Sequence, residues 1–212
     1  MNYHPDQQSS IFQCELSSYL ISCPLLALSE SEEIIDDESL ISSEEVVVTL
    51  TNTGYIKRVP LNSYRSQRRG GKGRAGMTTK EEDYVNKVFV VNTLTPLLFF
   101  SSMGIVYKLK TYKIPSGSPT SKGKALVNIL PLRSGEKITT TMPYDQSDEK
   151  NNIIFATSSG NIRRNRLTDF HNINANGKIA MKLKEDDKLI NVIICSEKEN
   201  IFMSTRLGKC VR

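Results

Sequence analysis

A short pattern returns four times along this chain, and its spacing constrains the fold more than any other feature. Each copy reads as an apolar run, a Ser or Thr, two residues, a Gly, one residue, an apolar residue, one residue and a cation. The glycines stand 50, 56 and 48 residues apart, at Gly54, Gly104, Gly160 and Gly208. Repeats of this length, each too small to bury its own faces, predict units that stack on their neighbours.

The residues around each glycine predict short antiparallel strands joined by tight turns. The predicted pairs are Val46–Leu50 with Ile56–Arg58, Leu97–Phe100 with Ile105–Lys110, and Ile153–Phe155 with Asn161–Arg164. A further strand precedes the second, third and fourth turns, at Val88–Val91, Ile138–Thr141 and Ile190–Ile194. The apolar runs are nearly continuous and helical periodicity is weak, as expected for strands covered on both faces. We therefore expect an all-β array of about three to four four-stranded antiparallel blades.

A second repeated element lies at a nearly constant distance along the sequence from the first. It lies 17 to 19 residues behind the first three glycines, as Gly73-Arg74, Gly123-Lys124 and Gly177-Lys178. Two offsets that persist across three units indicate a repeated structure rather than chance.

Charge divides the chain into two parts. Residues 1–45 carry ten acidic residues and no Lys or Arg, so residues 46–212 hold 28 cations against 13 acids, a balance of +15. We expect residues 1–28 to be an unassigned segment, 29–45 an irregular acidic linker, and 46–212 the repeat region. The linker is either a solvated spacer or a segment that competes for the basic surface. The repeat region should attract a polyanion with strong salt dependence.

One loop is especially suited to phosphate. In Gln67-Arg68-Arg69-Gly70-Gly71-Lys72-Gly73, the three cations supply charge and donors, and the glycines let the backbone approach a duplex closely. Such a run also occurs in localisation patches and RNA-binding segments, so its context has to decide.

With its repeats and this loop, the chain from about Asp36 onward resembles the C-terminal DNA-wrapping domain of the A-type subunit of bacterial DNA gyrase. The residues Gln67 to Gly73 match the box motif of that family without departure. The A-type subunit of topoisomerase IV is similar in its repeats but lacks an intact box, and it remains an alternative. The resemblance implies a β-pinwheel, here truncated as the fourth turn ends, with fewer blades than a complete family domain.

The resemblance also implies a role. It implies duplex DNA binding and wrapping, without sequence preference, as part of an ATP-dependent type II topoisomerase that introduces negative supercoils. The implied partners are DNA, the gyrase B subunit and the cleavage domain of the gyrase A subunit, in the cytoplasm at the nucleoid. ATP and Mg²⁺ would bind on other domains, so no cofactor is expected in this chain.

The expected DNA-binding residues combine the loop with a belt of repeated cations. By the two-residue period of a strand, the cation four positions after each glycine lies just past the core, at the blade rim. The full set of expected contacts is Gln67, Arg68, Arg69, Gly70, Gly71, Lys72, Gly73, Arg74, Arg58, Lys108, Lys122, Lys124, Arg163, Arg164, Lys178 and Arg212.

Other functions have weaker support. The G-x-G-x-x-G at Gly71–Gly76 follows a polar segment and lacks the acid that a ribose needs, and no P-loop is present. The four cysteines have no CxxC spacing and the two histidines are far apart, so we expect no metal site and no catalytic residue. The apolar run Tyr19–Leu28 is too short to span a bilayer. The alternative from another class is a blade scaffold that binds protein or RNA.

Overall fold

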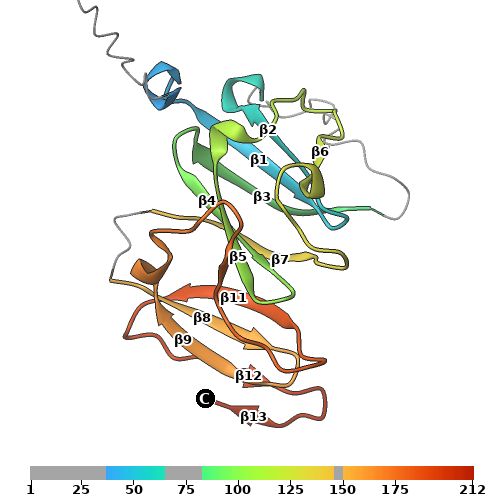
Figure 1. Ribbon diagram of the computed structural model, residues 1–212, viewed down its shortest axis with the longest axis vertical. Helices are drawn as coiled ribbons and strands as arrows, with labels where there is room; N and C mark the ends of the chain where they lie inside the picture. Colours follow the sequence, from blue (N-terminus) through green and yellow to red (C-terminus); the bar gives the residue numbers. More distant parts are fainter. Residues whose placement is uncertain (1–36, 65–82, 146–149) are drawn as a thin grey trace, which may run out of the picture. The chain divides into compact units, whose positions relative to one another are not determined.

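The computed structural model describes residues 37–64, 83–145 and 150–212 (Figure 1). These belong to one compact unit, Asp36–Arg212. The segment 1–28, linker residues 29–36 and the loop Gln67–Gly73 with Arg74 lie outside the described residues. Across the described ranges every regular element is a strand or a 3-10 turn, which confirms the predicted all-β class.

Two sheets have four antiparallel strands each. The first has the order β3-β1-β2-β6, with β1 at Glu45–Thr51, β2 at Tyr55–Pro60, β3 at Val85–Asn92 and β6 at Lys124–Ala125. The second has the order β10-β5-β4-β7, with β4 at Pro96–Ser101, β5 at Ile105–Lys110, β7 at Ile138–Pro143 and β10 at Lys178–Ile179.

The remaining strands form smaller sheets. The third sheet has the order β11-β8-β9, with β8 at Asn152–Thr157, β9 at Ile162–Arg166 and β11 at Leu189–Cys195. A last hairpin joins β12, Met203–Ser204, to β13, Cys210–Val211. The 3-10 turns are η1 Asp37–Leu40, η2 Leu61–Ser63, η3 Thr111–Lys113, η4 Leu126–Asn128 and η6 Leu167–Phe170. All nine predicted strand segments fall on observed strands, to within a few residues at their ends.

The repeated Ser or Thr and the repeated Gly build the same turn four times. The glycine N–H donates to the carbonyl oxygen three residues earlier, at 3.0 to 3.1 Å in all four copies. The side-chain oxygen at that earlier position accepts the N–H of the residue after the glycine, as Thr51 does from Tyr55 at 3.1 Å. Ser101, Thr157 and Thr205 make the equivalent bond. Each of the four glycines has φ between +74° and +88°, the region where a side chain is disfavoured.

The second glycine element supplies the edge strand of the preceding sheet. Behind Gly123, β6 pairs with β2, and behind Gly177, β10 pairs with β5. A Cβ on Gly123 would lie 2.5 Å from the carbonyl oxygen of Ile56, so only glycine allows this approach. In the part of the chain that the structure describes, β9 receives no such strand. Two sheets therefore have the predicted four strands, and each of their edge strands comes from the repeat that follows. The third sheet has three strands among the described residues.

Two apolar clusters hold the sheets together. Strand β4 contributes alternately to both: Leu97 and Phe99 to the cluster with the first sheet, Leu98 and Phe100 to the cluster with the third. This two-sided burial explains why the apolar run of β4 is continuous. Phe100, Phe155 and Phe170 meet edge to face or tilted in the second cluster, with ring centroids 5.7 to 6.1 Å apart.

The described end of the acidic linker is bonded to the repeat region. It contains the turn η1, and its last residue, Glu45, belongs to β1. Glu38 forms an ion pair with Lys110 of β5. The N–H of Glu44 donates to the hydroxyl of Thr93 at 3.1 Å. Long-range hydrogen bonds and one ion pair thus fasten this stretch to the repeat region.

Candidate nucleic-acid interface

Strand β2 carries a buried cation that the sequence patterns did not single out. Lys57 is 1 % exposed, although it directly precedes Arg58 in the repeat. Its ammonium donates to the carbonyl oxygens of Ser118 at 3.2 Å and Ser121 at 2.9 Å, and also to that of Pro119. Burial lowers the pKa of Lys57. Lys57 therefore holds the loop that leads to β6.

Arg58 supports the same loop from its other end. Its Nε donates to the carbonyl oxygen of Ile114 at 2.6 Å, and its backbone bonds to Pro115 and Gly117 at 3.1 and 3.0 Å. The side chain is half-buried beside the first apolar cluster, as the two-residue period predicts. Part of its donor capacity is thus used within the protein.

The loop held by Lys57 and Arg58 presents two of the expected contact residues. Lys122 lies over the ring of Tyr55, with its ammonium 4.1 Å from the centroid. Lys124 is exposed on β6. Both cations are therefore placed by bonds from β2.

The equivalent cation of the second sheet is also partly engaged. Lys108 is half-buried, and its ammonium donates to the carbonyl oxygen of His171 at 2.7 Å and lies 5.0 Å from the Tyr144 ring centroid. Burial is the main cause that lowers the pKa of Lys108, and the nearby charge of Lys110 lowers it further. This position matches the predicted rim, at the border of the second apolar cluster.

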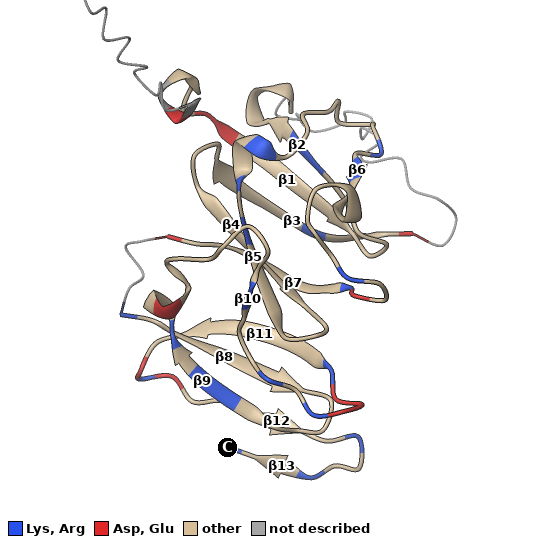
Figure 2. Cartoon of the chain, in the orientation of Figure 1, with Lys and Arg blue, Asp and Glu red and all other residues tan. Residues whose placement is uncertain are grey.

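Strand β9 differs, because its cations are exposed. Arg163, Arg164 and Arg166 all face solvent, and the strand carries a blue band in Figure 2. The Nε of Arg163 donates to the side-chain oxygen of Asn165 at 3.0 Å. Arg212, at the last position, is exposed as well.

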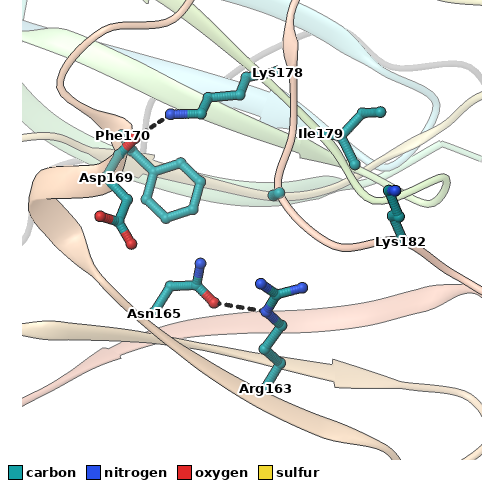
Figure 3. Close-up of a pocket in the computed structure, with 8 residues that line it drawn as sticks. Arg163, Asn165, Asp169, Phe170, Lys178, Ile179 and Lys182 are labelled. Atoms are coloured by element: carbon teal, nitrogen blue, oxygen red, sulfur yellow. Dashed lines mark hydrogen bonds between the residues drawn. The ribbon is translucent and has the colours of Figure 1, made fainter.

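Three cations from separate elements line one pocket. Arg163 of β9 lies opposite Lys178 and Lys182, which belong to β10 and the segment after it (Figure 3). The ammonium of Lys178 donates to the backbone carbonyl oxygen of Asp169 at 2.6 Å. Lys182 was not among the expected contacts, because it belongs to no repeated motif. The structure thus brings Arg163 and Lys178 together and adds Lys182.

Two acidic residues cap the repeated turns instead of neutralising these cations. Asp187 accepts hydrogen bonds from the hydroxyl of Ser159 at 2.6 Å, the hydroxyl of Ser158 at 2.7 Å and the N–H of Ser159 at 3.0 Å. These bonds, that from the Ser159 hydroxyl foremost, hold the pKa of Asp187 well below its usual range. Burial opposes ionisation of Asp83, but hydrogen bonds from Thr53 outweigh it and lower its pKa. Both carboxylates have structural roles.

Features of other site classes are few in the described ranges. Those ranges contain no group of three His, Cys, Asp or Glu side chains that could hold a metal ion. Cys195 is a buried free thiol and Cys210 an exposed one. Among the same residues, none of the helical elements has the length and apolar character needed to cross a bilayer.

Comparison with known proteins identifies the repeats. The family model described as "DNA gyrase C-terminal domain, beta-propeller" matches residues 45–92, 95–145 and 151–196, one match for each of the first three repeats. The DNA gyrase A subunit of Rickettsia conorii is 55 % identical over 180 residues, which cover 84 % of this chain and 20 % of that protein. The same subunit of Granulibacter bethesdensis is 48 % identical over 84 % of this chain and 19 % of its own length. The chain thus spans about a fifth of these relatives.

Solved structures agree on the fold. A DNA gyrase A C-terminal domain superimposes with a TM-score of 0.57 at 28 % identity, covering 79 % of this chain and 53 % of that one. The C-terminal domain of DNA topoisomerase IV superimposes with a TM-score of 0.69 at 24 % identity, over 81 % of this chain and 52 % of that one. At that identity the topoisomerase IV likeness shows the fold alone. From the three repeat matches and the gyrase relatives, we conclude that this chain belongs to the DNA gyrase C-terminal domain family.

Proposed function

We propose that this chain binds duplex DNA without sequence preference and wraps it, as part of the A subunit of a DNA gyrase. The observation that carries the proposal is the combination of family membership with the +15 balance of residues 46–212. The exposed arginines of β9 add support, because a cation open to solvent can displace counterions from a phosphate backbone.

The proposed contacts are the residues expected from the sequence. They are Gln67 to Gly73 with Arg74, and the repeat and loop cations Arg58, Lys108, Lys122, Lys124, Arg163, Arg164, Lys178 and Arg212. Of these, Arg58 and Lys108 are half-buried and donate to backbone carbonyl oxygens, so we expect the exposed cations of β9 and β6 to contribute more of the DNA contacts.

Wrapping requires that the contacts between protein and DNA offset the free energy needed to bend the DNA. Smooth bending of a site of about 20–30 base pairs through 40–90° costs on the order of 1–6 kcal/mol. Several phosphate contacts can offset this without reading any base, as in other proteins that bend DNA through its backbone. Repeated cations on successive sheets are suited to that task.

The chain itself would carry out no chemistry. We propose that it works with the cleavage domain of the gyrase A subunit and with the gyrase B subunit, and that ATP and Mg²⁺ bind on those other domains. Wrapping would present a neighbouring DNA segment in one handedness and so give strand passage its negative-supercoiling direction. This activity belongs in the bacterial cytoplasm, at the nucleoid.

The test is the salt dependence of binding. Affinity for a duplex of mixed sequence is measured by fluorescence anisotropy at several salt concentrations, with a second duplex of unrelated sequence as the control. We expect log affinity to fall linearly with log salt, at about 0.9 units for each phosphate contacted, and equally for both duplexes. A slope near zero would reject DNA wrapping and favour the scaffold alternative.

A second experiment examines the loop in the complete enzyme. Replacing Arg68, Arg69 and Lys72 with Ala in a reconstituted gyrase should abolish negative supercoiling but leave ATP-dependent relaxation, because strand passage needs no wrap. The same number of replacements at Lys184, Lys188 and Lys198, which lie outside the proposed contacts, is the matched control. Normal supercoiling by the loop variant would remove the loop from the proposal.

A further inference from the structure

The pocket between β9 and β10 contains more positive than negative charge, and its cations form no ion pair with any described residue. Its volume is about 230 Å³, and the charged side chains that line it are Arg163, Lys178, Lys182 and Asp169. Between described residues, the one ion pair within 4 Å is that of Lys110 with Glu38. Three cations therefore face one carboxylate without being neutralised by it.

Two of the three cations are already oriented. The bond from Arg163 Nε to Asn165 leaves the terminal guanidinium nitrogens toward the pocket, and Lys178 is fixed by the Asp169 carbonyl oxygen at 2.6 Å (Figure 3). Orientation before binding reduces the entropy that an incoming ligand must overcome. A planar guanidinium with free N–H groups suits the paired oxygens of a phosphate.

The base of the pocket is apolar and closed. Phe170 and Ala180 are 1 % and 4 % exposed, and the N–H groups of Ala180 and Met181 both bond to the carbonyl oxygen of Gly104, at 2.9 and 3.1 Å. A ligand is therefore held by side-chain cations over an apolar floor. Exposed Arg and Lys side chains above this floor suit a small anion such as a phosphate.

We infer that this pocket is a phosphate-binding slot that takes one phosphodiester group of the wrapped duplex between Arg163, Lys178 and Lys182. The inference rests on the proposed DNA-binding function and adds Lys182 to its contacts. The slot joins the edge strand of the second sheet to β9 of the third, so a phosphate seated there bridges two successive sheets.

The first test uses inorganic pyrophosphate and the 212-residue chain. Pyrophosphate is titrated while amide resonances are followed by NMR. The resonances of Arg163, Ile179 and Lys182 should shift together in a saturable way, and the shifts should be lost in Arg163→Gln. Shifts spread evenly over all exposed lysines, or no shifts, would overturn the slot.

The second test uses duplex DNA and a matched pair of variants. Lys182→Gln removes a slot cation, whereas Lys184→Gln removes a lysine two residues away that lies outside the slot. Lys182→Gln should weaken binding about tenfold at low salt, as expected for a charged hydrogen bond, and lower the salt slope by about one unit. Lys184→Gln should do neither.

The outcomes separate this inference from the function on which it rests. If the unaltered chain binds DNA with a steep salt slope and the two variants behave alike, the slot is wrong and the proposed function stands. If pyrophosphate binds at the slot but Lys182→Gln leaves DNA binding unchanged, the slot takes free phosphate only and the phosphodiester assignment is overturned. If the unaltered chain binds no DNA, both fail.

Discussion

Strands β2 and β9 occupy the same place in their repeats, yet they use nearly the same sequence differently. Ile56-Lys57-Arg58 and Ile162-Arg163-Arg164 each begin two residues after the repeat glycine. In β2 the isoleucine is fully buried and Lys57 is 1 % exposed; in β9 the isoleucine is 44 % exposed and both arginines face solvent. The difference comes from β6 and the loop before it, which cover β2 and have no counterpart beside β9 in the described residues.

This comparison shows that the repeat motif fixes the strand but not the role of its cation. A cation covered by the next edge strand becomes part of the structure, and an uncovered one stays available to an anion. Substitutions of the covered residues of β2 should therefore alter the stability of the fold. Substitutions of the exposed cations of β9 should alter only the binding of DNA.

The largest effect is expected at Gly123, because β6 reaches β2 only through this glycine. Gly123→Ala combines a φ of +80° with a Cβ only 2.5 Å from the Ile56 carbonyl oxygen. We expect the free energy of unfolding to fall by about 3 kcal/mol, measured by urea denaturation. Gly54→Ala is the control, since its φ is +88° but nothing lies within 4 Å of the added Cβ. It should cost only about 1 kcal/mol, and equal losses would refute the role of close approach.

The second-largest effect on the free energy of unfolding is expected at Lys57. Lys57→Met keeps the length of the side chain but removes its hydrogen bonds to the carbonyl oxygens of the loop. The free energy of unfolding should fall by about 2 kcal/mol, and amide hydrogen exchange of Gly117 and Ser121, whose N–H groups are hydrogen-bonded in this loop, should accelerate. Arg163→Met, at the equivalent position of β9, should change stability little because Arg163 is exposed. The comparison of the two strands is wrong if both variants lose the same stability.

A smaller effect, with a definite pH dependence, is expected at Tyr107, the residue of β5 that corresponds to Lys57. Its hydroxyl donates to the buried Glu136 at 2.9 Å, and burial, then this bond, raise its pKa to about 12. A raised pKa stabilises the fold below the unfolded-state value of about 10, and this contribution is lost as pH rises toward about 12.

The matching variant is Tyr107→Phe. It should lower the free energy of unfolding by about 1 kcal/mol near neutral pH. The difference from the unaltered chain should shrink between about pH 10 and about pH 12, as followed by urea denaturation at each pH. A difference that stays constant over this range would show that the hydroxyl and Glu136 are not coupled.

Much of the fold could be predicted because the same turn motif recurs in each repeat of the sequence. The Ser/Thr-x-x-Gly spacing encodes a turn that is closed by two local hydrogen bonds, so Thr51, Gly54 and their equivalents sufficed to place the hairpins. The edge strands could not be assigned, because the pairing of β6 with β2 joins residues almost 70 positions apart. Nothing near Lys124 in sequence indicates which sheet it joins.

The sequence located the basic region but not the environment of each proposed contact residue. Charge counting located the basic region, yet the bonds of Arg58 to Ile114 and of Lys108 to His171 depend on loops from later in the chain. Lys57 was missed because a lysine at a strand position ordinarily indicates solvent exposure. Lys182 was missed because it contributes to a site only through the approach of β9 and β10.

The most direct test of the account is the salt dependence of duplex DNA binding after two cations of β9 are removed. Replacing Arg163 and Arg164 with Gln should leave the sheet intact, because both side chains are exposed. We predict that the slope of log affinity against log salt falls by about two units, while the free energy of unfolding stays unchanged. A slope equal to that of the unaltered chain would contradict the account, because these two arginines would then make no DNA contacts.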